Sequence, residues 1–295
     1  MIEFQIAQEY TGQQRHVCYL MPWFRQVLEQ DMCVPGVPSR VRDLVSGRSY
    51  GNVNCGMTAV TNTGDDENWT GHDLAAANLY GFGRLAYDMS LDPAALAREW
   101  ARLTFGLDRQ VADTLTDILM NSWPAYEKYT SPLGIGWMVS PNNHYGPSVD
   151  GYEYDRWGTY HRANHRGLGV ERGRDGTDYC SQYNEPLASL YEDPATCPEE
   201  LLLFFHHMPY THRLSTGKTI IQHIYDTHFE GAQMAADFLT ALERIRPLLP
   251  ADAYERMHQR LTHQKEHARD WRDIVNTYFH RISDIDDEQG RKIYE

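Results

Sequence analysis

The sequence predicts an α/β segment over residues 1–92, followed by a mainly helical domain with long loops over residues 93–295. Two observations predict the first part: it contains two short strand-like runs, and a run with helical spacing follows each of them. A third observation predicts the second part, because its apolar residues mostly recur at intervals of three and four. The order strand, helix, strand, helix is typical of a parallel sheet or a barrel, and two such units are too few to close a barrel.

The first strand is expected over residues 2–8, where apolar Phe4 and Ile6 alternate with polar residues such as Glu3. Glu9 follows at the carboxyl end of this strand, where barrel enzymes carry catalytic side chains. Glu3 and Glu9 cannot both serve one site, because about 20 Å of strand would separate them at roughly 3.3 Å per residue. Glu9 is therefore the candidate catalytic carboxylate.

The other elements of the first part alternate between helix and strand. They are predicted over residues 16–30 (helix), 53–61 (strand) and 74–87 (helix). Pro22 marks a kink or a late start in the first of these helices. A polar loop follows the second strand, and Asn62 and Trp69 are candidate site residues there by position alone.

The second part begins with a capped helix. Asp92 can accept hydrogen bonds from the first turn, Pro93 suits the first helical position, and Gly106 supplies the stop. The predicted helices cover residues 93–105, 111–128, 199–207, 219–246 and 252–282. The last two form an antiparallel hairpin, whose long apolar seam serves either an internal core or a dimer interface.

Residues 129–198 are dense in Gly, Pro, Asn, Tyr and Trp, and no long helix or strand is expected there. A stretch of this length inside a domain is usually functional. The alternative is a disordered linker, which the aromatic content disfavours.

The charge balance argues against a nucleic-acid partner. The chain has 27 basic and 41 acidic residues, a formal net charge of −14 and no basic run of five or more. No apolar run reaches about 18 residues, so no membrane partner is expected. The 7 Trp, 19 Tyr and 9 Phe suit sugar rings, which stack on aromatic planes, although such residues also fill loop-rich domains.

No metal and no cofactor is expected. The five cysteines share no CxxC spacing, which disfavours a disulfide framework and fits reduced thiols in a cytoplasmic protein. His263 and His267 have helical spacing without an HExxH motif, and the cluster from His206 to His212 lacks one too. No Walker loop, dinucleotide motif or GxSxG elbow occurs.

Several motifs stand out in order along the chain. The first is EFQIAQEYTGQQRH, at residues 3–16. The others are NNHYGP at 142–147, GYEY at 151–154, WGTYHR at 157–162 and GRKIY at 290–294. Together they resemble the α-glucuronidases of glycoside hydrolase family 67, and the resemblance covers nearly the whole chain.

This resemblance implies both an architecture and an activity. The family has an N-terminal α/β domain, a (β/α)8 TIM barrel and a helical C-terminal domain that wraps the barrel and can mediate dimers. Residues 1–92 would then be the last units of the barrel, and residues 93–295 the C-terminal domain. The implied reaction is hydrolysis, with inversion, of the α-1,2 link between glucuronic acid, or its 4-O-methyl ether, and the terminal xylose of xylo-oligosaccharides.

The resemblance also implies roles for single residues. The Glu of the QEY motif falls on Glu9, which would act as general base and activate water together with an Asp. That Asp and the general acid Glu should lie on earlier strands, which this sequence lacks. Trp157 resembles the tryptophan that covers the 4-O-methyl group, and Trp137 is a nearby competitor. The alternative role for Trp157 is a buried anchor that ties the long loop to the barrel.

The sequence is therefore consistent with two functions. The first is a fragment of a cytoplasmic α-glucuronidase acting on xylan-derived aldouronic acids, inactive in isolation and a homodimer through its C-terminal helices; a missing N-terminus could carry a signal. The second is a non-catalytic module that binds carbohydrate or dimerises.

Overall fold

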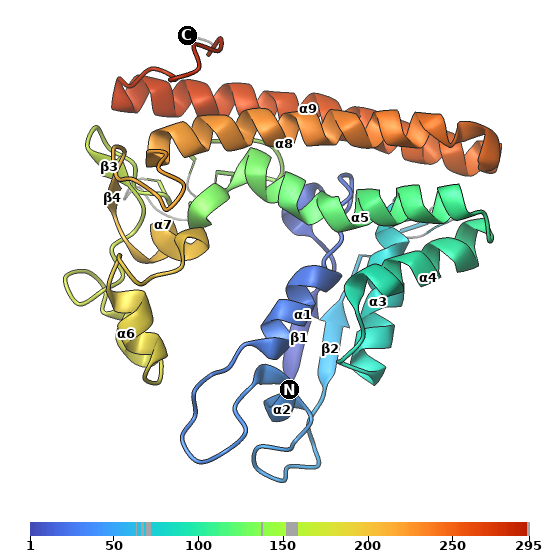
Figure 1. Ribbon diagram of the computed structural model, residues 1–295, viewed down its shortest axis with the longest axis horizontal. Helices are drawn as coiled ribbons and strands as arrows, with labels where there is room; N and C mark the ends of the chain where they lie inside the picture. Colours follow the sequence, from blue (N-terminus) through green and yellow to red (C-terminus); the bar gives the residue numbers. More distant parts are fainter. Residues whose placement is uncertain (63, 66–67, 69–71, 137, 152–158, 294–295) are drawn as a thin grey trace. The chain divides into compact units, whose positions relative to one another are not determined.

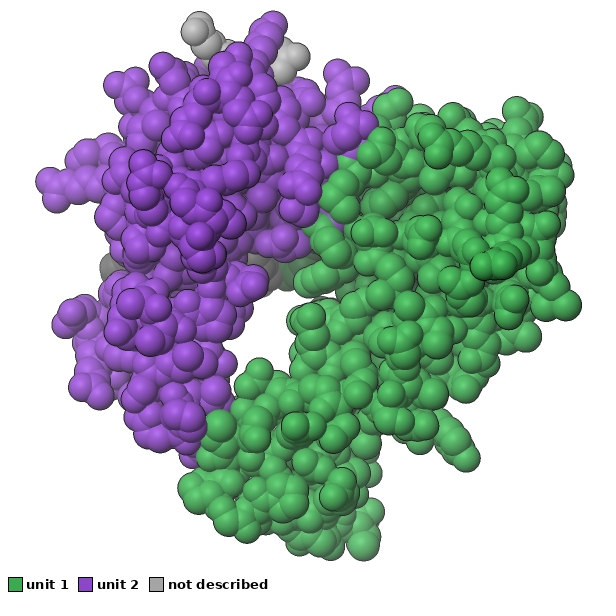
Figure 2. Space-filling model, viewed as in Figure 1, with its two compact units in different colours: residues 1–124, 234–265 green, residues 125–233, 266–295 purple. Residues whose placement is uncertain are grey.

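The computed structural model describes residues 1–295 except 63, 66–67, 69–71, 137, 152–158 and 294–295. It is mainly helical with a few short strands, as the sequence predicts (Figure 1). Unit 1 comprises residues 1–124 and 234–265, and unit 2 comprises residues 125–233 and 266–295 (Figure 2). Three helices contribute residues to both units: α5 (Arg109–Thr130), α8 (Ile220–Arg244) and α9 (Ala251–Ser283). Among the described helices, none is both long and apolar enough to cross a membrane.

The sheet of unit 1 pairs β1 (Ile2–Gln5) with β2 (Met57–Val60) in parallel. Ile2 lies beside Met57, and Gln5 beside Val60. The buried ring of Phe4 lies 4.4 Å, centroid to centroid, from that of Phe24 on α1 (Met21–Glu29). The parallel pairing of the two predicted strands is thereby confirmed.

Three more helices of unit 1 are α2 (Val41–Val45), α3 (Ala76–Tyr87) and α4 (Pro93–Phe105). The ends of α4 follow the local signals in the sequence. The Asp92 carboxylate accepts a hydrogen bond from Ala95 N at 2.8 Å, and Pro93 takes the first helical position. Gly106 ends the helix with φ 96°, in the region that favours glycine.

The helix predicted over residues 16–30 starts late, because α1 begins only at Met21. Main-chain N–H groups in residues 17–20 instead donate to side chains from distant helices. The acceptors are Gln264 Oε1 of α9 for Val17, Ser122 Oγ of α5 for Tyr19 and Asn78 Oδ1 of α3 for Leu20, each at 2.8 Å. These side chains satisfy buried backbone donors in the segment before α1.

Unit 2 has a short antiparallel pair, β3 (Gly167–Leu168) with β4 (Met208–Pro209). Its short helices are α6 (Leu187–Glu192) and α7 (Leu202–Phe205). Tyr191 of α6 and Phe205 of α7 stack with ring centroids 4.7 Å apart and planes at 6°. An aromatic contact thus joins the end of the loop-rich stretch to the element that follows it.

Ionic groups tie the chain after α9 to α8 within unit 2. Asp287 accepts hydrogen bonds from Arg291 Nε at 2.8 Å and from Gln222 Nε2 at 2.7 Å. Arg291 also reaches Asp226 of α8, and its guanidinium carbon lies 4.3 Å from the centroid of the Phe229 ring. Asp226 and Asp287 are both buried, so each carboxylate depends on these partners.

Candidate functional site

Hydrogen bonds continue between the carboxyl ends of β1 and β2 after Gln5, the last residue of β1. Val60 O accepts hydrogen bonds from Ile6 N at 2.8 Å and from Ala7 N at 3.1 Å. Asn62 Nδ2 donates to Ala7 O at 2.9 Å. The structure therefore brings Asn62 to the main chain two residues before Glu9.

Glu9 begins a short 3-10 helix, Glu9–Thr11, and is half-buried, whereas Glu3 is exposed. The strand predicted over residues 2–8 ends earlier, at Gln5, and Gln8 adopts a left-handed conformation with φ 52°. More left-handed residues follow: Gly12 (φ 67°), Gln13 (φ 55°) and Gln14 (φ 72°). Such angles are costly for residues other than glycine and persist where surrounding structure enforces them.

Buried polar side chains support this turn. The Thr11 hydroxyl lies 2.9 Å from Gln8 O and 3.2 Å from Gln8 Oε1, and it accepts a hydrogen bond from Gln14 N at 3.3 Å. Gln14 Nε2 donates to Ile6 O at 2.9 Å, and Gln8 Nε2 donates to Cys18 O at 2.7 Å. No sequence pattern predicts a role for these three residues. The one signal in the sequence is a cluster of uncharged polar residues around Gly12 at a strand end.

Two of the predicted site residues, Trp69 and Trp157, lie outside the described residues, as does the competitor Trp137. Their contacts with a sugar stay predictions. Glu9 and Asn62 are described, and both belong to unit 1.

Three histidines of the two units bond to the main chain, and two of them, His72 and His206, are buried. His72 Nδ1 accepts from Leu74 N at 3.2 Å, and burial, with a smaller contribution from Arg260, lowers the pKa of His72 to about 3. His206 and His207, from the histidine-rich motif, bond to the main-chain oxygens of Tyr191 and Gly169, both at 2.8 Å. These contacts give the three imidazoles structural roles.

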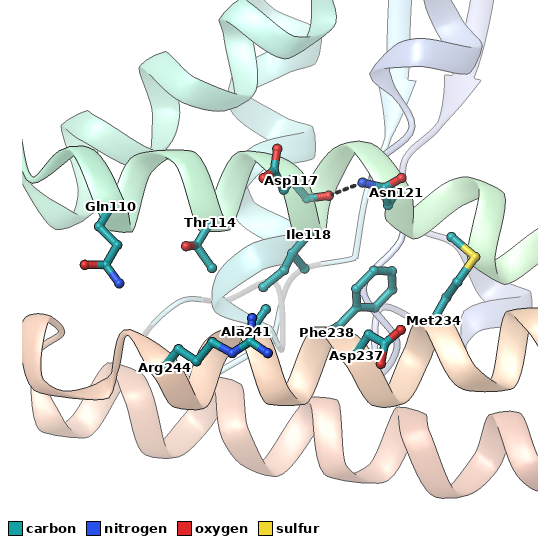
Figure 3. Close-up of a pocket in the computed structure, with 10 residues that line it drawn as sticks. All are labelled: Gln110, Thr114, Asp117, Ile118, Asn121, Met234, Asp237, Phe238, Ala241 and Arg244. Carbon is teal, nitrogen blue, oxygen red and sulfur yellow. Dashed lines mark hydrogen bonds between the residues drawn. The ribbon is translucent and has the colours of Figure 1, made fainter.

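A groove of about 530 Å³ lies between α5 and α8 in unit 1 (Figure 3). Buried Ile118 and Phe238 contribute apolar surface, while Asp117, Asp237 and Arg244 contribute charge. None of its ten lining residues is a site residue predicted from the sequence. The groove therefore shares no lining residue with the turn that carries Glu9.

Two family models match the chain one after the other. Residues 1–69 match the glycosyl hydrolase family 67 middle domain, and residues 70–292 match the glycosyl hydrolase family 67 C-terminus. Glu9 and Asn62 thus fall in the first match, and the long helices in the second.

Curated relatives are similar over nearly all of this chain. It is 43% identical over 292 residues to a protein of Aspergillus clavatus named probable alpha-glucuronidase A, and 42% identical over 292 residues to alpha-glucuronidase A of Aspergillus tubingensis. Each match covers 98% of this chain and 35% of the relative. A Neosartorya fischeri protein named probable alpha-glucuronidase A is 43% identical over 99% of this chain. The chain spans about a third of the length of the curated relatives it matches.

Proposed function

Because the chain belongs to glycosyl hydrolase family 67, we propose that it forms part of an α-glucuronidase. The proposed reaction is the inverting hydrolysis of the α-1,2 link between glucuronic acid, or its 4-O-methyl ether, and the terminal xylose of aldouronic acids. In this proposal β1 and β2 are the last strands of a (β/α)8 barrel. The observation that carries it is the position of Glu9, half-buried just past the carboxyl end of a parallel strand.

Glu9 acts as the general base in the proposed mechanism. Its carboxylate takes a proton from water while the water oxygen attacks the anomeric carbon from the face opposite the xylose. The bond from the anomeric carbon to the xylose oxygen breaks, and a general acid protonates that oxygen. In inverting enzymes the two carboxyl groups lie roughly 6.5–9.5 Å apart, which leaves room for the water.

The general acid and the Asp that helps Glu9 are assigned to barrel strands upstream of residue 1. On this proposal, purified residues 1–295 release no methylglucuronic acid from aldouronic acids. A longer chain that includes the upstream strands releases it. Chromatography of the products after incubation of both proteins distinguishes the two results.

The substrate contacts proposed from the sequence are Trp157, Asn62 and Trp69. Trp157 is assigned to the 4-O-methyl group, since an indole offers a broad apolar face. Replacement of Trp157 by Ala should then lower kcat/KM more for methylated than for unmethylated aldouronic acids. Equal losses on the two substrates would contradict this role.

The role of Glu9 is tested in the longer enzyme by Glu9→Ala, with Glu3→Ala as the matched control. Loss of the general base should lower kcat about 100- to 10,000-fold. Glu3 is exposed on β1, so its variant should keep the parental rate. A Glu9→Ala enzyme of undiminished kcat would overturn the assignment.

A further inference from the structure

The turn that carries Glu9 combines a costly backbone conformation with three buried polar side chains, which bond to the backbone of the turn and of its flanking residues. Gln8 and Gln14 both have positive φ, and Thr11 lies between them. The three side chains are buried, with exposed fractions of 8% for Gln8, 4% for Thr11 and 0% for Gln14. Strained backbone of this kind is concentrated at functional sites, where the neighbouring structure must hold it.

The partners of these side chains are main-chain groups on both sides of Glu9. Gln14 Nε2 binds Ile6 O, three residues before Glu9, and the Thr11 hydroxyl binds Gln8 O, one residue before it. Gln8 Nε2 binds Cys18 O, where the chain leaves the turn. Each bond therefore fixes the path of the backbone that places Glu9.

Thr11 is the centre of this network. Its hydroxyl contacts both the main-chain and the side-chain oxygen of Gln8 and also receives the N–H of Gln14. One oxygen atom thereby links the two left-handed glutamines across the 3-10 helix that begins at Glu9. Loss of this atom would leave the Gln14 N–H without that acceptor in a buried place, where an unpaired donor is costly.

We propose that Gln8, Thr11 and Gln14 are positioning residues for Glu9, which hold the strained turn so that the Glu9 carboxylate keeps its place beside the attacking water. This inference rests on the proposed function of Glu9. A general base acts only within hydrogen-bond reach of the proton it removes, and a shift of about 1 Å can cost roughly 100-fold in rate. The three residues touch no substrate in this proposal and act through the backbone.

The experiment compares Thr11→Val and Thr11→Ser in the longer α-glucuronidase that contains this chain. Valine keeps the shape and removes the hydroxyl, whereas serine keeps the hydroxyl. We expect Thr11→Val to lower kcat about 10- to 100-fold with KM changed less than about twofold. Thr11→Ser should recover most of the rate.

Thr116→Val is the matched control. Thr116 is also a threonine of unit 1 with an exposed fraction of 4%, and its hydroxyl donates to Ala112 O at 2.7 Å within α5. Its loss removes a buried hydroxyl bond without touching the turn. We expect Thr116→Val to keep the parental kcat and only Thr11→Val to lose it.

Gln14→Met provides a second variant of similar shape, which removes the bond to Ile6 O and serves if Thr11→Val does not fold. It should show the same loss of kcat at nearly constant KM. A folded Thr11→Val or Gln14→Met enzyme with parental kcat overturns the positioning role. Parental kcat in Glu9→Ala would instead overturn the proposed function itself, so the two failures are distinguishable.

Discussion

Gln264 of α9 binds both main-chain groups of Val17 within unit 1. Its Oε1 accepts from Val17 N at 2.8 Å, and its Nε2 donates to Val17 O at 3.2 Å. Both residues are fully buried, so no solvent replaces either bond. A single side chain thus pairs both main-chain groups of a residue that lies outside the described helices and strands.

Replacement of Gln264 by Leu should lower the free energy of unfolding, because it leaves Val17 N and Val17 O without these partners. One buried unpaired group costs about 1–3 kcal/mol. Because the variant leaves two such groups, we expect the free energy of unfolding to fall by about 2 kcal/mol or more. Urea unfolding followed by circular dichroism measures this change. Gln259→Leu, at an exposed position of the same helix, should change stability by less than about 0.5 kcal/mol.

Glu127 on α5 should make unit 2 less stable at high pH. Burial, together with the charge of Glu200, raises the pKa of Glu127 to about 7, against the opposing effects of Lys128 and of a hydrogen bond from Leu133 N–H. A carboxyl group with a raised pKa in the folded state stabilises the fold below its unfolded pKa of 4.5 and loses that contribution as the pH rises through about 7.

The variant Glu127→Gln should therefore be more stable than the parent at pH 8 by about 1–2 kcal/mol, a figure discounted for the half-buried position. At pH 4 the difference should largely vanish. Melting temperatures measured from pH 4 to pH 8 test this. A constant difference between the two proteins over that range would contradict the account.

Protonation of Asp287 at low pH should lower the stability of unit 2. Burial alone would raise its pKa, but hydrogen bonds from Arg291, Gln222 and the main chain outweigh burial and hold the pKa well below the ordinary value of 3.8. A depressed pKa contributes stability that is present above the unfolded pKa and is lost as the pH falls toward the folded one. The melting temperature of the parent should therefore fall below about pH 4.

Arg291→Met should weaken this acid dependence, because it removes the partner while keeping an apolar contact with Phe229. At pH 7 the variant should also melt lower, since a buried carboxylate loses its ion pair. Arg281→Met, at an exposed position of the same unit, is the control and should follow the parental profile. An identical fall in melting temperature below about pH 4 for the parent and for Arg291→Met would disprove the role of Asp287.

A homodimer through the C-terminal helices is the proposed assembly. Ile274 of α9 is 40% exposed and lines a hollow of about 380 Å³ with Val149 and Tyr278. Light scattering should then give twice the chain mass of 34.1 kDa, and Ile274→Glu should give the monomer. Leu103→Glu, at a 70% exposed position of α4, should remain dimeric. A parental monomer at all concentrations would exclude the proposal.

Local signals predicted some elements well. The cap at Asp92, the proline at position 93 and the stop at Gly106 act within one turn of the chain, and α4 has the predicted bounds, 93–105. The first strand followed from alternation, which reflects burial on one side, and the parallel pairing followed from the strand–helix–strand–helix order.

Long-range contacts decide what the sequence did not predict. Residues 17–20 carry a helical pattern of apolar side chains, yet N–H groups of this segment bond to acceptors from α3, α5 and α9, and the helix begins only at Met21. The candidate site divides in the same way. Glu9 follows from its place after a strand, whereas the bonds among Gln8, Thr11 and Gln14 depend on left-handed angles that no spacing reveals.

The main-chain N–H groups of residues 17–20 determine which truncations of this chain leave its hydrogen bonds intact. Val17, Tyr19 and Leu20 lie in the part that matches the middle domain, and their acceptors Gln264, Ser122 and Asn78 all lie in the part that matches the C-terminus. A protein ending at residue 69 would therefore expose three backbone donors and lose the packing around them. The border between the two family matches separates sequences, but within unit 1 the residues on either side of it complete each other's hydrogen bonding.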